Sequence, residues 1–104
     1  MKLLEFVVKE FISVVEYLEN EHPIENDRII VEREEFKALL GKYNYTTFSR
    51  KTKIYKQLNF IVHDKNNYTM PYKDTVLKKT VRKVIINYNT YIALKHLYET
   101  VIDI

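Results

Sequence analysis

Hydrophobic residues near the start of the chain recur every three or four positions, which is typical of a helix with one buried side. This spacing predicts a helix from Lys2 to about Asn20, which ends where Glu21-His22-Pro23 turns the chain out of the α conformation. The buried stripe consists of Leu4, Val7, Val8, Phe11, Val14, Val15 and Leu18. Four more residues widen it, namely Leu3, Phe6, Ile12 and Tyr17. The widened stripe fits either a broad core contact or the surface of a second subunit.

A short β-branched segment and two longer amphipathic segments follow along the next part of the chain. Residues 28–31 form a β-branched run that predicts a short strand, and residues 32–40 predict a helix with acids in its first turn. Gly41 stands where a helix commonly ends on a residue of positive φ. After a polar connection, Thr46-Thr47 offers an N-cap to a second amphipathic helix from about Phe48 to Leu58. The inward residues of that helix are Phe48, Thr52, Tyr55 and Leu58.

The last third of the chain is predicted to be extended before it becomes helical again. Residues 60–63 favour a strand, residues 64–67 a turn, and residues 80–86 a second β-branched strand. The loop between these strands then spans residues 64–79. Asn89 can cap a final helix, whose apolar residues are Tyr91, Leu94, Leu97, Tyr98 and Val101.

Charge divides the chain unevenly. Residues 1–36 carry ten acids and four bases, whereas residues 37–104 carry thirteen bases and four acids. Ten of those bases fall between Phe48 and Lys83, where only two acids occur. A clustered basic surface raises the local potential and attracts polyanions. We therefore expect a nucleic acid as partner, in preference to a lysine face that is merely solvated.

Two helices joined across residues 41–46 and followed by a two-stranded hairpin occur in the order of a winged helix-turn-helix. The segments VEREEFKALLGKY, TTFSRKTKIYKQLNFI and KKTVRKVIINYNTYIALKHL resemble winged-helix DNA-binding domains, among them the small ones of phages and conjugative elements of low-GC bacteria. The resemblance implies an α+β fold of three to four helices with a small antiparallel β-hairpin wing, and it covers residues 28–97. Residues 1–20 add an N-terminal helix and residues 89–104 a C-terminal helix. We expect residues 1–104 to form a single domain, since no linker interrupts them.

The predicted helix from Phe48 carries the residues best suited to contact DNA. The major groove of B-DNA admits one helix, and a helix held by its apolar face points its polar face at the base edges. Arg50 could pair with a guanine and Gln57 with an adenine, while lysines of the helix and of the hairpin suit phosphates. Tyr68 and Tyr72 could donate to phosphates, or stack on the bases of a single strand. The full set of expected nucleic-acid contacts is Thr47, Ser49, Arg50, Lys51, Lys53, Lys56, Gln57, Lys65, Tyr68, Tyr72, Lys73, Lys78, Lys79, Arg82 and Lys83.

Composition argues against several other classes of function. The absence of cysteine removes disulfides, thiol nucleophiles and thiolate zinc sites, and it suits a reducing cytoplasm. His22, His63 and His96 lie far apart, and neither a metal-binding spacing nor a phosphate-binding glycine loop occurs. The first residues lack the pattern of a signal peptide, and no apolar run is long enough to span a membrane. We expect a cytoplasmic, non-catalytic protein without metal, cofactor or small-molecule substrate.

Three functions remain open at this point. The first is sequence-specific or structural binding of double-stranded DNA, as a transcription regulator or an accessory factor of a mobile element, with a homodimer formed through the N-terminal or C-terminal helix. The second is a protein-interaction module, an inhibitor or adaptor, that binds no nucleic acid. The third is RNA binding, which requires exposed tyrosines beside a basic groove. Steep salt dependence separates the first from the second, because phosphate binding releases counterions.

Overall fold

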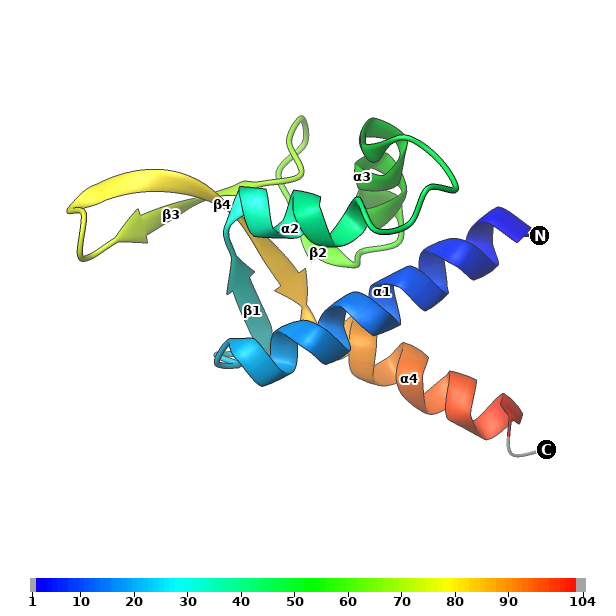
Figure 1. The fold of residues 1–104 in the computed structure, drawn as a ribbon. Coiled ribbons are helices and arrows are strands. Elements are labelled where there is room, and N and C mark those ends of the chain that lie inside the picture. Colours follow the sequence, from blue (N-terminus) through cyan, green and yellow to red (C-terminus); the bar gives the residue numbers. More distant parts are fainter. Residues whose placement is uncertain (1, 103–104) are drawn as a thin grey trace.

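The computed structural model describes residues 2–102 and holds four helices and four strands among them (Figure 1). Their bounds are α1 Lys2–Glu21, β1 Arg28–Val31, α2 Arg33–Leu40, α3 Phe48–Gln57, β2 Ile61–Val62, β3 Met70–Asp74, β4 Lys79–Asn87 and α4 Tyr88–Ile102. Met1, Asp103 and Ile104, which the predicted helices 1–20 and 89–104 include, lie outside the described residues. The chain has an α+β fold with a small antiparallel sheet, an arrangement compatible with a winged helix.

Strand β4 is the centre of the sheet. It pairs antiparallel with β1, where Val31 lies opposite Val84, and with β2, where Ile61 lies opposite Ile86. The strand order is therefore β1-β4-β2. The β-branched runs predicted as strands are both confirmed, and β4 extends one residue beyond the prediction at each end. Such side chains fit the pleated, half-buried surface of a strand.

The predicted loop of residues 64–79 is wrong in one respect, because it contains a strand. Strand β3 pairs with the first half of β4, and only residues 75–78 remain as the turn between the two. The strand predicted over residues 60–63 is correspondingly short, since β2 holds two residues. Strand β3 was not predicted because it contains Pro71. Proline cannot donate a backbone hydrogen bond to a neighbouring strand and occurs in strands chiefly at sheet edges. Pro71 lies opposite Arg82.

Strands β2 and β3 are separated by an excursion of the chain. The last residue of β2, Val62, lies opposite Ile85, and the first residue of β3, Met70, lies opposite Lys83. Residues 63–69 thus leave the ladder and return to it within two positions of β4. Beyond this point β3 and the first half of β4 form a hairpin that projects from the body of the molecule (Figure 1).

Phe11 of α1 lies at the centre of an aromatic core. Its ring stacks on Phe60 with the centroids 4.0 Å apart, and it meets Tyr55 and Tyr91 edge to face. These rings come from α1, α3, α4 and the segment before β2, so one cluster joins three helices to the sheet. The stripe predicted for the first helix is buried at Val7, Phe11, Val14, Val15 and Leu18. Leu4 departs from the prediction, since it is exposed.

Helix α3 begins and α2 ends as predicted, but the conformation of Gly41 differs from the prediction. The Thr47 side chain accepts a hydrogen bond from the Arg50 backbone N–H at 3.2 Å, which confirms the N-cap. The prediction of positive φ at Gly41 is wrong, because its φ is −66°. Space explains the glycine better, since a Cβ there would lie 3.3 Å from the Lys37 carbonyl oxygen.

Helix α4 follows β4 without a connecting loop. The predicted cap at Asn89 is wrong, because α4 already begins at Tyr88. Asn87, the last residue of β4, takes the capping position, and its side-chain oxygen accepts from the Thr90 N–H at 3.3 Å. Asparagine suits this role because its short side chain can satisfy a free N–H of the first turn.

Candidate nucleic-acid interface

The outer face of α3 is polar and positively charged. Ser49, Arg50, Lys53 and Gln57 are exposed, and Lys56 is partly exposed. At 3.6 residues per turn these positions fall within an arc of about 120° on the helix surface. None of the ten residues of α3 is acidic. The residues predicted to face a groove, apart from Lys51, therefore share one surface, with the exposed Thr47 at its start.

The inner face of α3 is fixed by aromatic contacts. Tyr55 and Phe48 meet the ring of Phe36 on α2 edge to face, with centroids 5.9 and 6.2 Å away. Thr52 is buried beside them. Leu58, predicted to point inward, is exposed instead, because it lies beyond the last helical residue and the helical spacing no longer sets its direction.

The prediction that Lys51 contacts nucleic acid is wrong. Its side chain is only 2% exposed and points into the protein. The ammonium donates to Glu10 Oε2 at 2.8 Å, to the Leu40 carbonyl at 2.6 Å and to the Tyr43 carbonyl. These three acceptors match the three donor hydrogens of a lysine. Lys51 thus fastens α3 to α1 and to the end of α2.

Glu10 is the anion at the centre of this buried cluster. Besides Lys51, it accepts hydrogen bonds on Oε1 from the Tyr45 hydroxyl at 2.7 Å and the Tyr55 hydroxyl at 2.8 Å. Burial and the negative charge of Glu10 raise the pKa of both tyrosines, which keeps them protonated as donors. This cluster was not predicted from the sequence. Its signal was an acid at a stripe position, since Glu10 follows Val7 by three residues.

The hairpin of β3 and β4 presents a second set of cations. Lys73, Lys78 and Lys79 are exposed near its tip. The tip is shaped by Asp74, whose Oδ1 accepts hydrogen bonds from the backbone N–H groups of Val76 and Leu77, at 2.9 and 3.0 Å. These bonds, together with nearby lysines, lower the pKa of the Asp74 carboxyl. Of the predicted wing lysines, Lys73, Lys78 and Lys79 thus gather near the tip of the hairpin.

The Arg82 side chain is hydrogen-bonded to other residues of the protein. One guanidinium nitrogen lies 2.6 Å from the Asp64 carboxylate and 2.7 Å from the Thr69 carbonyl, while its Nε donates to the Thr69 hydroxyl at 2.8 Å. The arginine bond lowers the pKa of Asp64, as do the N–H groups of Asn66 and Asn67. Arg82 therefore closes residues 63–69 onto β4, and two of its hydrogen-bonding nitrogens are already engaged.

Lys83 and Tyr72 form a second internal contact on the hairpin. The Lys83 ammonium lies 2.8 Å from Glu32 Oε1 and 5.0 Å from the centroid of the Tyr72 ring. The bond to Glu32 raises the pKa of Lys83, and the lysine side chain is only 14% exposed. Lys83 therefore joins the hairpin to Glu32 at the N-cap of α2, and the Tyr72 ring lies beside the Lys83 ammonium, so neither of these predicted contact residues is freely exposed.

The excursion of residues 63–69 lies against α2 and α3. Tyr68 stacks on Phe36 at 6.1 Å and meets Phe48 edge to face at 5.5 Å. Tyr68 is thus not an open platform for bases, contrary to the expectation from its polar surroundings. Lys65, at the exposed end of the same segment, is free of such packing and lies in the turn that was predicted at residues 64–67.

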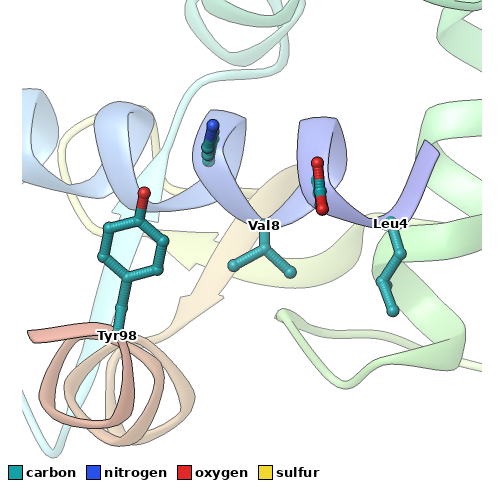
Figure 2. A pocket seen from close by; sticks show the side chains of 5 residues that line it. Leu4, Val8 and Tyr98 are labelled. Carbon is teal, nitrogen blue, oxygen red and sulfur yellow. The ribbon is translucent and has the colours of Figure 1, made fainter. Parts of the chain in front are cut away.

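A hollow of about 430 Å³ lies between α1 and α4. Figure 2 shows Leu4 and Val8 pointing from α1 and Tyr98 rising from α4 toward α1. Glu5 and Lys9 complete the lining. Leu4 and Tyr98 are 49% and 40% exposed, so the groove is open to solvent. Leu4 and Val8 belong to the stripe that was predicted to be buried, and none of the four residues that widen the stripe lines this hollow.

The described residues offer binding surfaces of two kinds, one cationic and one apolar. Among residues 2–102, no three His, Asp or Glu side chains come close enough together to hold a metal ion. No helix in that part of the chain has the length and apolar character needed to cross a membrane. Compared with known proteins, the chain matches no family model and no curated protein.

Proposed function

We propose that this protein binds duplex DNA without catalysing a reaction, with α3 in the major groove and the β3/β4 hairpin on the sugar-phosphate backbone. One observation carries the proposal. The exposed arc of α3 bears Arg50, Lys53 and Lys56 and no acid, while the opposite side of the helix is buried. A helix divided in this way is suited to lie in a groove lined by phosphates.

The exposed residues of α3 have different roles in this proposal. Arg50, in the first turn, is long enough to make paired hydrogen bonds with a guanine, and Gln57 matches an adenine. Ser49, Lys53 and Lys56 suit phosphates, which fix position without reading sequence. We propose that sequence preference, where it exists, depends chiefly on Arg50.

The hairpin adds affinity that is independent of sequence. Lys73, Lys78 and Lys79 are exposed on it, and each phosphate contact that a lysine makes releases counterions from the DNA. Binding is therefore expected to weaken steeply as salt rises. A regulator of transcription or an accessory factor of a mobile element both fit this mode of binding.

A homodimer through the groove between α1 and α4 extends the proposal. Glu5 and Lys9 lie four residues apart on one side of α1. A two-fold axis passing between them would set Glu5 of one copy opposite Lys9 of the other, so the surface is complementary to itself, as a two-fold interface requires. Leu4 and Val8 would be buried in the same contact. Such a dimer can place two copies of α3 on paired half-sites.

The test is the binding of fluorescently labelled random-sequence duplex DNA between low and physiological salt, with single-stranded DNA and RNA in parallel. We expect duplex binding that falls steeply with salt. Lys53→Ala should weaken it for every sequence. The matched control is Arg28→Ala, which removes an exposed cation at the start of β1 and should leave binding unchanged.

Other outcomes would replace the proposal. If no nucleic acid binds at low salt, the protein is an interaction module, and the apolar groove lined by Leu4, Val8 and Tyr98 becomes its binding surface. If single-stranded RNA binds more tightly than duplex DNA at every salt concentration, the cationic face serves RNA instead.

A further inference from the structure

Two apolar side chains are exposed to solvent at the tip of the hairpin. Val76 is 87% exposed and Leu77 is 57% exposed. Val76 is the most exposed large hydrophobic residue in the described part of the chain. Both lie in the four-residue turn between β3 and β4, away from the aromatic core. Nothing in the fold of the monomer accounts for their apolar character.

The turn that carries these residues is firmly built. The Asp74 carboxylate accepts hydrogen bonds from the backbone N–H groups of both Val76 and Leu77. Lys78 closes the turn at a φ of +55°, a conformation that costs a lysine more than it would cost glycine. Turns usually employ Gly, Asn, Asp or Ser, whose chemistry favours the bend. The conformation of the turn therefore does not require a valine or a leucine at these positions.

Cations surround the apolar pair. Lys73, Lys78 and Lys79 are exposed next to it, whereas the one acid, Asp74, is engaged by the backbone. A partner that matches this tip must present anionic groups on both sides of an apolar interior. The minor groove of duplex DNA has this chemistry, because its phosphates border a stack of bases.

We propose that Val76 and Leu77 act as a wedge that enters the minor groove and partly unstacks a base step, so that the protein bends the duplex it binds. The inference rests on the proposed duplex binding and adds a mechanical effect to it. Apolar wedges of this kind kink DNA by about 20–90° toward the major groove. Pyrimidine–purine steps unstack most easily, so they are the preferred sites.

The placement of the tip suits this action. The molecule measures 50 × 27 × 24 Å, and the hairpin projects from its body (Figure 1). With α3 in one groove, a projecting hairpin is free to reach the neighbouring one. The lysines then contact the phosphates on either side of the opened step.

The experiment compares the full-length protein with the Val76→Ser/Leu77→Ser variant on a 30-base-pair duplex labelled at both ends for energy transfer. The wild type should shorten the distance between the ends. The variant should bind the intact duplex about tenfold more weakly and leave it straight, with an unchanged thermal unfolding midpoint because both side chains are exposed. Ile24→Ser removes an exposed apolar side chain outside the hairpin and should behave as the wild type.

A second duplex with a central mismatch sharpens the test. A mismatched step costs less to unstack, so the wild type should gain affinity on it; the variant, which does not unstack the step, should not gain, and its deficit in affinity should widen. Vesicles of equal parts phosphatidylcholine and phosphatidylglycerol serve as the comparison surface. Binding to vesicles that depends on Val76 and Leu77, together with straight DNA, would assign the tip to a membrane surface and overturn the wedge.

The remaining outcomes separate this inference from the proposed function. Duplex binding by the wild type without bending, or equal bending by the variant, overturns the wedge and leaves duplex binding intact. Absence of duplex binding by the wild type overturns both.

Discussion

The ammonium of Lys51 on α3 lies 2.8 Å from the carboxylate of Glu10 on α1, and neither side chain is more than 2% exposed. A buried ion pair contributes little net stability, because desolvation offsets much of the attraction. Its effect here is on position. Lys51 also binds the carbonyls of Leu40 and Tyr43, so it holds the connection between α2 and α3, which is longer than the turn of a tight helix-turn-helix.

Lys51→Met should lower the free energy of unfolding by about 3–5 kcal/mol, because it leaves Glu10 buried without its cation. Urea unfolding followed by circular dichroism measures the change. Glu10→Gln combined with Lys51→Met should recover part of the loss. The matched control is Lys53→Met, two residues along the same helix but exposed, which should change stability by less than about 0.5 kcal/mol. Equal effects of the two single variants would contradict the role given to the pair.

Arg50→Ala should relax sequence preference at one base position, at a cost of about 1–3 kcal/mol there. The reason is that a side chain bonded to base edges discriminates among bases, whereas one bonded to phosphate does not. Selection from a randomised duplex library measures the preference at each position. Lys53→Ala in the same assay should weaken all sequences alike. A uniform loss for Arg50→Ala would instead make it a phosphate contact.

Replacing Lys78 and Lys79 together by alanine should weaken binding to every duplex. Each lost phosphate contact removes about 0.9 from the slope of log affinity against log salt concentration, so the slope should fall by about two. Fluorescence anisotropy titrations at four or five salt concentrations give this slope. An unchanged slope would show that the hairpin does not lie on the backbone.

Leu4→Glu should abolish the proposed homodimer, because it places a carboxylate in the apolar groove between α1 and α4. Sedimentation equilibrium over a range of protein concentrations measures the mass. Glu5→Lys alone should weaken the dimer by setting like charges opposite each other, and adding Lys9→Glu should restore it. A wild type that stays monomeric at all concentrations would rule out this interface.

Tyr88→Phe should lower stability by about 1 kcal/mol at neutral pH and have no effect in strong alkali. The Tyr88 hydroxyl donates to Glu19 at 2.6 Å, and this bond, followed by burial, raises the pKa of Tyr88 from 10.0 to about 12. A raised tyrosine pKa means that the stabilisation is complete below pH 10 and is lost as the pH rises toward 12. Unfolding free energies of both proteins between pH 8 and 12 test this. A difference that stays constant over that range would exclude the linkage.

Periodicity predicted the helices and the buried strands because each depends on local spacing. Val7, Phe11 and Leu18 recur at intervals that a helix buries together, and the β-branched residues of β4 favour a strand. Thr47 was predictable for the same reason, since an N-cap needs only its own following residues. The exposed arc of α3 followed from the same alternation.

Contacts between distant segments could not be predicted in this way. Lys51 has the type and spacing of an exposed lysine, and its partner Glu10 lies 41 residues away. Tyr68 was assigned to a polar loop because its neighbours are polar, yet its ring packs on Phe36. In both cases the side chain is placed by the tertiary fold, which overrides the local pattern.

The two halves of strand β4 pair with different strands, the first half with β3 and the second half with β1 and β2. Ile85 and Ile86 lie between β1 and β2, whereas the residues from Lys79 to Lys83 are paired only with β3 among the described strands. The outer half of the strand can therefore open and close while the inner half stays paired. Amide protons on a single strand will exchange with solvent at two different rates, and the hairpin can adapt its shape to a ligand without loosening the core.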